Sequence, residues 1–385
     1  MLEDDWRAAA LPLFAEGLVD ALEWSFDTAT TLPAWAEALL DHYAAAGRLW
    51  GHGVTFSLLA AHDPPSLQAG APSWLPTPAD GEPAGLDARQ TRWLERLAAE
   101  RARRPYARVS EHLGVTAAGD LLDGPPLPAP LCEDVLAVGA DRLRRLSQVA
   151  VGPVGVENLA LCASRADALA QGPFLEALLE TSGGWLLLDL HNLLALAWNF
   201  DLRPEELLET YPLARARALH LSGGSWSTPA ADPQGRPFRR DTHDDALPPE
   251  LLELLDLALV RCPDLELVVL ERRGGTIAGP AAAERFRRDA EAVRAGCLAR
   301  ASADPAAPLA PPSRPAPPLA PAAERRLATA QRRLLELLRG GDPPQAIARS
   351  LAEEPAFAPF QPHYAAWEPR AVEVAAELVA RWGVA

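Results

Sequence analysis

The 385-residue chain contains no lysine, so every basic side chain is an arginine, and acidic residues outnumber basic ones by 52 to 36. Together with abundant Ala, Pro and Leu, the absence of lysine indicates a coding bias rather than a function. The formal net charge of −16 argues against a nucleic-acid partner, because proteins that bind nucleic acid concentrate positive charge on one surface. We therefore expect no nucleic acid among the partners.

Cysteine is also scarce, and its four copies, Cys132, Cys162, Cys262 and Cys297, lack CxxC spacing. The sequence therefore predicts neither a zinc-thiolate site nor a disulfide framework. No apolar run is long enough to cross a membrane, and the opening MLEDDWRAAALPLF lacks the segments of a secretion signal. These features lead us to expect a cytoplasmic protein with no membrane partner.

Short apolar runs alternate with helical stretches along most of the chain, and 49% of the residues are hydrophobic. Seven predicted strands fall at residues 20–26, 49–59, 107–114, 154–160, 185–192, 217–223 and 265–273. Strands that alternate with long helices form parallel βα units. We expect an α/β fold of the TIM-type (β/α)₈ barrel class, with an eighth strand at residues 8–18, although an open doubly wound sheet fits the same pattern.

The composition changes near residue 300. Residues 301–322 are almost entirely Ala and Pro, which favours an extended spacer over a helix. Helical apolar spacing resumes in ERRLATAQRRLLELLRGG and PRAVEVAAELVARWG. The predicted organisation is a metal-binding barrel at residues 1–300, an Ala/Pro-rich linker at 301–322 and a small helical C-terminal appendage at 323–385.

A polar side chain of a metal-ligand type lies at the end of nearly every predicted strand. In WLLLDLHN, read as one buried strand, Asp189 and His191 project to the same side. The carboxyl ends of barrel strands meet at one pocket, so we expect these groups to converge. The full candidate set is His52, His112, Glu157, Asp189, His191, His220, Asp241, His243 and Glu271.

Nine candidate ligands exceed the four to six or so that one transition metal accepts, so the sequence predicts two or more ions. Imidazoles and carboxylates without thiolate suit iron, manganese or zinc. For any one of these side chains, a hydrogen-bonded core residue is the simpler interpretation, and only their number favours metal binding. Two arginines near the candidate ligands, Arg240 and Arg272, are weaker candidates for binding a substrate carboxylate.

In this order, the motifs HGVTFS, SEHL, VENL, LLDLHN, HLSGG, DTH and LERR resemble those of the family once called domain of unknown function 692. Its members are multinuclear non-haem iron-dependent oxidative enzymes like the one that acts in methanobactin biosynthesis, and the resemblance covers about residues 18–290. It implies a TIM-type barrel with two or three irons, O₂ as co-substrate, and oxidation of a ribosomally made precursor peptide presented by a small partner protein. No side chain beyond the metal ligands would then be catalytic.

Carried over by motif, the implied ligands are the candidates above except His191, which stands where the family commonly has Asn. Gly224 replaces the second His of the family motif H-L-A-G-H, and Glu111 replaces the Asp of S-D-H. The glycine-rich strand that usually opens the family is not recognisable. We expect His191 to act as a ligand in place of the family's Asn.

Two other classes of function fit the same residues. A divalent-metal TIM-barrel sugar isomerase or phosphoester hydrolase would also carry His, Asp and Glu at its strand ends, and fold alone does not decide between reactions. A catalytically silent peptide-binding or protein-binding module would keep the barrel without a working centre.

Overall fold

The structure, a computed structural model, describes residues 3–28, 31–62, 86–118, 126–300 and 306–382. Its strands are β1 (Leu22–Trp24), β2 (Leu49–Gly53), β3 (Val109–His112), β4 (Gly155–Glu157), β5 (Trp185–Asp189), β6 (Ala216–Leu221), β7 (Trp226–Ser227), β8 (Phe238–Arg239) and β9 (Leu267–Leu270). The barrel helices are α1 (Asp4–Ala15), α2 (Ala34–Ala45), α3 (Leu86–Arg103), α4 (Glu133–Ala150), α5 (Arg165–Ser182), α6 (Leu190–Asn199), α7 (Pro204–Leu208), α8 (Pro249–Arg261) and α9 (Gly279–Arg300). The C-terminal helices are α10 (Pro321–Arg339), α11 (Pro344–Glu353) and α12 (Pro369–Trp382).

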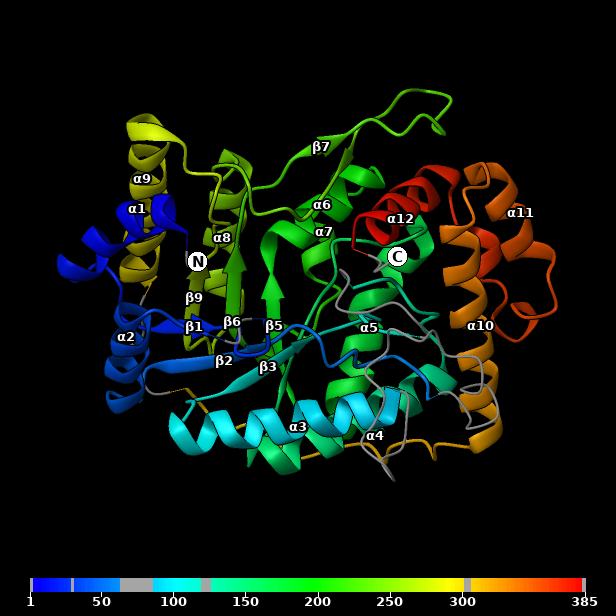
Figure 1. The fold of residues 1–385 in the computed structure, drawn as a ribbon, viewed down its shortest axis with the longest axis horizontal. Helices are drawn as coiled ribbons and strands as arrows, with labels where there is room; N and C mark the ends of the chain where they lie inside the picture. Colours follow the sequence, from blue (N-terminus) through cyan, green and yellow to red (C-terminus); the bar gives the residue numbers. More distant parts are fainter. Residues whose placement is uncertain (1–2, 29–30, 63–85, 119–125, 301–305, 383–385) are drawn as a thin grey trace.

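Seven strands form one parallel sheet in the order β1-β2-β3-β4-β5-β6-β9, with helices around it (Figure 1). The sheet curls into a nearly closed barrel, which confirms the predicted TIM-type fold with a helical C-terminal region. The Nε2 atom of His220 on β6 lies 2.7 Å from a carboxylate oxygen of Glu23 on β1, so the sheet curls enough for these side chains to meet. The facing edges of β1 and β9 pair with no other described strand.

Strands β2, β4, β5 and β6 are buried along their whole length, as apolar strands covered by helices should be. At the end of the barrel where the strands begin, the rings of Trp50 and Trp185 pack edge to face against each other, and Leu187 and Ala218 belong to the same apolar cluster. A Cβ added at Gly155 would lie 2.5 Å from the Trp185 ring, so only glycine fits beside it. This apolar cluster fills one end of the barrel, and the polar side chains lie at the other end.

Two sequence predictions about secondary structure are wrong. Residues 8–18, proposed as an eighth strand, lie mostly in helix α1, which packs against α9 through Trp6, Ala10 and Leu13. The stretch read as one strand through His191 ends at Asp189, whose carboxylate accepts a hydrogen bond from the backbone N–H of Asn192 and caps α6. His191 therefore projects from the first turn of a helix.

The C-terminal helices share one hydrophobic core with the barrel. Helix α10 packs on α4, and its Gln331 side chain bonds the backbone of Leu59 and Ala61, at 2.9 Å each. Residues 306–320 run along the end of the barrel where strands begin, with the carbonyl of Ala307 accepting from Arg217 at 2.8 Å (Figure 1). Of the predicted linker, residues 301–305 lie outside the described part. The three-part division of the chain stays a prediction, which limited proteolysis within residues 306–320 would test.

None of the described helices combines the length and the apolar character needed to cross a membrane.

Candidate metal centre

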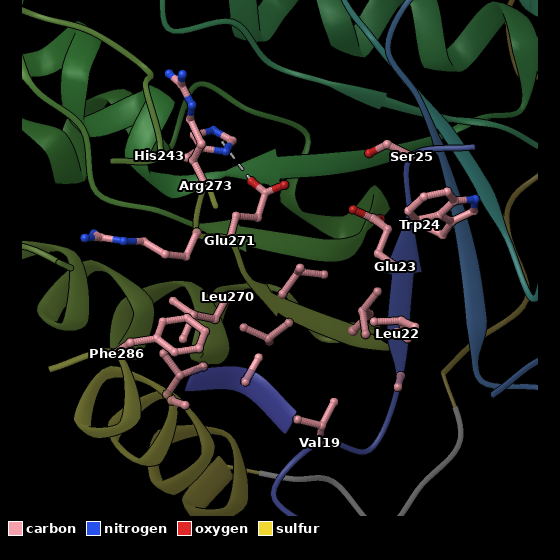
Figure 2. Close-up of a pocket in the computed structure, with 18 of the residues that line it drawn as sticks. Val19, Leu22, Glu23, Trp24, Ser25, His243, Leu270, Glu271, Arg273 and Phe286 are labelled. Carbon is pink, nitrogen blue, oxygen red and sulfur yellow. Dashed lines mark ion pairs between the residues drawn. The ribbon is translucent and has the colours of Figure 1, made fainter. Parts of the chain in front are cut away.

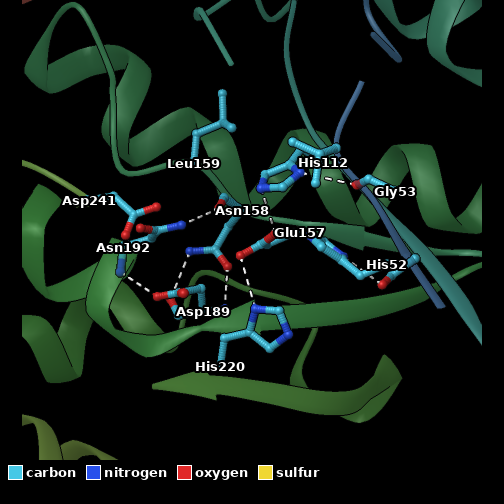
Figure 3. A network of polar contacts seen from close by, with 12 residues as sticks. His52, Gly53, His112, Glu157, Asn158, Leu159, Asp189, Asn192, His220 and Asp241 are labelled. Atoms are coloured by element: carbon cyan, nitrogen blue, oxygen red, sulfur yellow. Dashed lines mark hydrogen bonds and ion pairs between the residues drawn. The ribbon is translucent and has the colours of Figure 1, made fainter. Parts of the chain in front are cut away.

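The structure brings the predicted ligands together at the carboxyl ends of the barrel strands. Figure 3 shows part of this set: His52, His112, Glu157, Asp189, His220 and Asp241. They come from eight elements: His52 on β2, His112 on β3, Glu157 on β4, Asp189 on β5, His191 on α6, His220 on β6, Asp241 and His243 after β8, and Glu271 after β9. Two groups are compact enough to hold a metal ion: His52, His112 and Glu157, and then Glu157, Asp189, His220 and Glu271. Within each group the ligand atoms lie within 4.8 Å of one another.

The first group is oriented by hydrogen bonds from outside it. His52 Nδ1 lies 2.9 Å from Ser110 Oγ, and His112 Nδ1 lies 3.2 Å from the carbonyl oxygen of Gly53. Both rings therefore turn Nε2 toward Glu157 Oε2, at 3.3 Å for His52 and 3.1 Å for His112. Partners of this kind fix the ring orientation of metal-binding histidines.

The second group shares Glu157 with the first. The other carboxylate oxygen, Oε1, lies 3.3 Å from His220 Nδ1, and Glu271 Oε2 lies 3.2 Å from the same nitrogen. Asp189 is held by Asn158, whose Oδ1 accepts from the Asp189 N–H at 2.7 Å. Because its two oxygens face different groups, Glu157 has the geometry of a carboxylate that bridges two cations.

The remaining three predicted ligands, His191, Asp241 and His243, form a separate cluster beside these two groups. Asp241 Oδ1 lies 2.6 Å from His243 Nε2 and 3.6 Å from His191 Nδ1, and His243 Nε2 lies 3.9 Å from Glu271 Oε2. His243 has a positive φ of 52°, a conformation that is uncommon outside glycine. Arg239 donates from Nε to His191 Nε2 at 3.2 Å, so only Nδ1 of His191 is left to face Asp241.

Two of the departures from the family motifs, His191 and Gly224, are neighbours in space. A Cβ added at Gly224 would lie 2.9 Å from Cε1 of His191 and 2.1 Å from the Arg240 carbonyl oxygen. The missing side chain at position 224 therefore leaves the room that the His191 ring occupies. A ligand role for His191 remains a prediction.

Sequence reasoning missed four polar residues that shape the centre. The Glu23 side chain on β1 is only 5% exposed and contacts His220, and the available signal is its position in the middle of an otherwise apolar strand, LEW. The Asn158 side chain bonds the Asp189 backbone, the Asn192 amide donates to the Asn158 carbonyl, and Arg239 donates to His191. The E-N and H-N pairs mark both asparagines, but nothing local marks Arg239, because its partner is 48 positions away.

Strong and opposed pKa shifts follow from packing these charges together. Burial raises the pKa of Asp189 well above its ordinary value, and the nearby charge of Asp241 adds to the effect. Burial also disfavours the charge on Glu157, but the imidazoles of His112 and His220 outweigh it and hold the pKa of Glu157 well below its usual range. Burial lowers the pKa of His243, yet the Asp241 and Glu271 carboxylates raise it to about 10. Without a cation, the centre is thus neutralised by bound protons.

The residues present fit metal ions. Several buried atoms of the centre form no hydrogen bond. Glu23 Oε2 and Asp189 Oδ2 are two of them, while Glu157 Oε2, Glu271 Oε2 and both ring nitrogens of His220 contact only oppositely charged groups of the same cluster. Buried polar atoms are normally paired, and unpaired ones signal a missing ion or water. The donor set contains only nitrogen and oxygen, which suits iron, manganese or zinc.

A cavity of about 1320 Å³ opens beside the centre, between β1, β9, α1 and α9. In Figure 2 the side chains of Glu23, Glu271 and His243 lie at one end of it, while Val19, Leu22 and Phe286 line the other. The predicted substrate-binding residues Arg240 and Arg272 also line this cavity, and their role remains a prediction. It follows the unpaired edges of β1 and β9, so the incomplete closure of the barrel creates it.

Comparison with known proteins adds a family to this geometry. Residues 81–285, just over half of the chain, match the family model described as RiPP precursor modification enzyme MbnB/TglH/ChrH, where RiPPs are peptides made on the ribosome and then modified. This match agrees with the resemblance seen in the motifs.

Several similar curated proteins carry the general name UPF0276. One from Caulobacter vibrioides is 32% identical over 154 residues, which is 40% of this chain and 52% of that protein. Another from Acaryochloris marina is 27% identical over 228 residues, 59% of this chain and 75% of that protein. The chain thus spans about half the length of the Caulobacter relative. A xylose isomerase-like TIM barrel protein from Mycobacterium smegmatis, solved with magnesium, is 12% identical with a TM-score of 0.42, over 77% of this chain and 91% of that one.

Proposed function

This chain belongs to the RiPP precursor modification enzyme family MbnB/TglH/ChrH, and from that premise we propose that it is a multinuclear non-haem iron enzyme that uses O₂ to oxidise a ribosomally synthesised precursor peptide. The family implies an enzyme with a peptide substrate. The observation that carries the metal part of the proposal is Glu157, whose carboxylate lies between two groups of His and carboxylate ligands.

Iron is proposed because the donors are imidazoles and carboxylates, and iron with open coordination positions supplies the redox chemistry that activates O₂. The protein's part is to place the ligands before a cation arrives. Ser110 and the Gly53 carbonyl set the His52 and His112 rings, and Asn158 sets Asp189. Burial of these groups keeps bulk water from the reacting atoms.

The cavity supports a peptide as the substrate. Its volume of about 1320 Å³ exceeds the roughly 300–1,000 Å³ of common small-molecule pockets. Its apolar wall at Val19, Leu22 and Phe286 suits peptide side chains, and Glu23 and Glu271 bring its polar end to the proposed metals. Arg240 and Arg272 would bind a carboxylate of the peptide, because guanidinium groups pair well with carboxylates.

A small partner protein that presents the peptide completes the proposal. The cavity can hold the residue to be modified and its immediate neighbours, whereas selection of one peptide by sequence needs a larger surface. We place the reaction in the cytoplasm, where a precursor peptide is made.

The test is oxidation of a precursor peptide, to be sought among the short reading frames beside the gene. Protein reconstituted with Fe(II) under anaerobic conditions should change the mass of that peptide only after O₂ is admitted, and the metal-free protein should not. Glu157→Gln, treated identically, should leave the peptide unmodified. A mass change that needs neither iron nor O₂ would contradict the proposed chemistry while leaving peptide modification in place.

A further inference from the structure

The segment that carries Asp241 and His243 has little structure of its own. It comprises residues 225–243, which we call the hairpin arm, and its two strands, β7 and β8, are only two residues long. Isolated two-stranded hairpins are marginally stable at best in water. Contacts from elsewhere must therefore hold the arm where it is seen.

Helix α12 supplies those contacts at the outer end of the arm. The Glu373 carboxylate accepts hydrogen bonds from the backbone N–H groups of Ala230 at 2.9 Å and Ala231 at 2.6 Å. Both bonds are charge-assisted and so belong to the stronger class. Figure 1 shows the arm extending beyond β7 above α12.

A buried arginine of α12 holds the base of the arm. The Arg370 guanidinium lies 5.5 and 5.7 Å from the ring centroids of Phe200 and Phe238, where cation–π attraction is favourable. It also donates to the Asn199 carbonyl and lies 3.8 Å from Asp232. Arg370 therefore joins the end of α6 to the strand β8.

The contacts continue from there to the proposed ligands. The Asn199 amide forms two hydrogen bonds with the Arg239 backbone, at 2.7 and 2.9 Å. The Arg239 guanidinium lies 5.4 and 5.3 Å from the ring centroids of Trp198 and Trp226, and its Nε donates to His191. Asp241, two residues after Arg239, then faces His191 and His243.

We propose that helix α12 is a positioning element of the metal centre: Glu373 and Arg370 fix the hairpin arm, and the arm in turn sets Asp241 and His243. The proposal rests on the proposed metal-dependent function. It gives the C-terminal helices a role, although they lie beyond the residues 81–285 that match the family model. Neither Glu373 nor Arg370 is among the proposed ligands, so both are positioning residues.

The experiment compares Glu373→Ala, Glu373→Gln and Arg370→Met with wild type in the full-length protein. Glu377→Ala is the matched control, because Glu377 is an exposed carboxylate one turn further along α12. Hydrogen exchange of peptides covering residues 226–240 reports on the arm, and titration of the metal-free protein with Co²⁺ reports affinity and the visible spectrum of the bound ion.

Glu373→Ala removes two charge-assisted hydrogen bonds and should speed exchange in the arm by at least about tenfold, the factor that matches the loss of one such bond. It should also weaken Co²⁺ binding by about tenfold and change the spectrum, as losses in a supporting shell do. Arg370→Met should act in the same direction. Glu373→Gln, which keeps an acceptor oxygen, should recover most of both effects, and Glu377→Ala should match wild type.

Faster exchange with an unchanged Co²⁺ affinity and spectrum would overturn the positioning role, as would exchange in the arm that matches wild type in every variant. If the wild-type protein binds no Co²⁺, the proposed function fails. In that case the exchange data alone still decide whether α12 holds the arm.

Discussion

Replacing Glu157 by glutamine should remove metal binding at both groups at once, because its two oxygens face different sets of ligands. Oε2 contacts His52 and His112 at 3.3 and 3.1 Å, and Oε1 contacts His220 at 3.3 Å. Glutamine keeps the shape of the side chain and loses its charge. An anionic bridge is therefore lost with little change in packing.

The loss of stability expected in Glu157→Gln follows from the coupling between metal binding and folding. An ion present at 100 times its Kd stabilises the folded state by about 2.7 kcal/mol per site. A 100-fold loss of affinity, the upper end of what even supporting residues cause, would remove most of that contribution at each of two sites, or about 5 kcal/mol in total.

The assay is the difference in thermal stability between metal-loaded and chelator-treated protein. Wild type should show a large difference and Glu157→Gln a small one. Glu111→Gln is the matched control. Glu111 is also a buried carboxylate, one residue before the ligand His112, but it belongs to neither ligand group and burial raises its pKa well above the usual range. If Glu157→Gln keeps the wild-type difference, the bridging role of Glu157 is wrong.

The other predictions concern single groups. Glu111→Gln should raise the Tm, more at pH 8 than at pH 5. Because burial raises the pKa of Glu111 in the folded protein, this carboxyl destabilises the wild type as the pH rises above the unfolded pKa of about 4.3, and glutamine removes that cost. Equal Tm shifts at both pH values would refute this. Metal affinity should increase from pH 6 to pH 8, because a cation must displace protons from imidazoles such as His243, whose pKa is raised to about 10. An affinity that does not change with pH in calorimetric titrations would contradict this prediction. Gly224→Ala should destabilise the protein by roughly 1–3 kcal/mol, because the added methyl group overlaps His191 and the Arg240 carbonyl. Gly296→Ala lies in helix α9 with room for a methyl group and should stabilise the protein by up to about 1 kcal/mol. Denaturant unfolding measures both changes.

The seven barrel strands could be predicted because each is a short apolar run separated from the next by at least one helical stretch. The N-terminal segment misled because Ala8–Leu18 is apolar enough for either state, and its packing against Phe286 and Ile277, more than 250 residues away, favours a helix. His191 was assigned to a strand because WLLLDLHN reads as one continuous apolar run. The strand ends at Asp189, two residues before His191, because the Asp189 side chain caps helix α6.

The candidate site could be located from the sequence because barrel topology alone requires strand ends to converge. Its finer arrangement could not. Nothing in the motifs separates Asp241 and His243 from the Glu157 groups, and the hairpin arm that carries them is held by Arg370 and Glu373, more than 100 positions away. Glu23 was missed because β1 is three residues long and offers no repeated pattern.

Elemental analysis of anaerobically purified protein tests the central claim most directly. The account predicts at least two metal ions per chain, iron when the expressing cells are supplied with it, and a fall in content when Asp241 or His243 is replaced by alanine without loss of the folded barrel. One ion or fewer per chain, or the same metal content in Asp241→Ala and His243→Ala as in wild type, would contradict a multinuclear centre built from these residues.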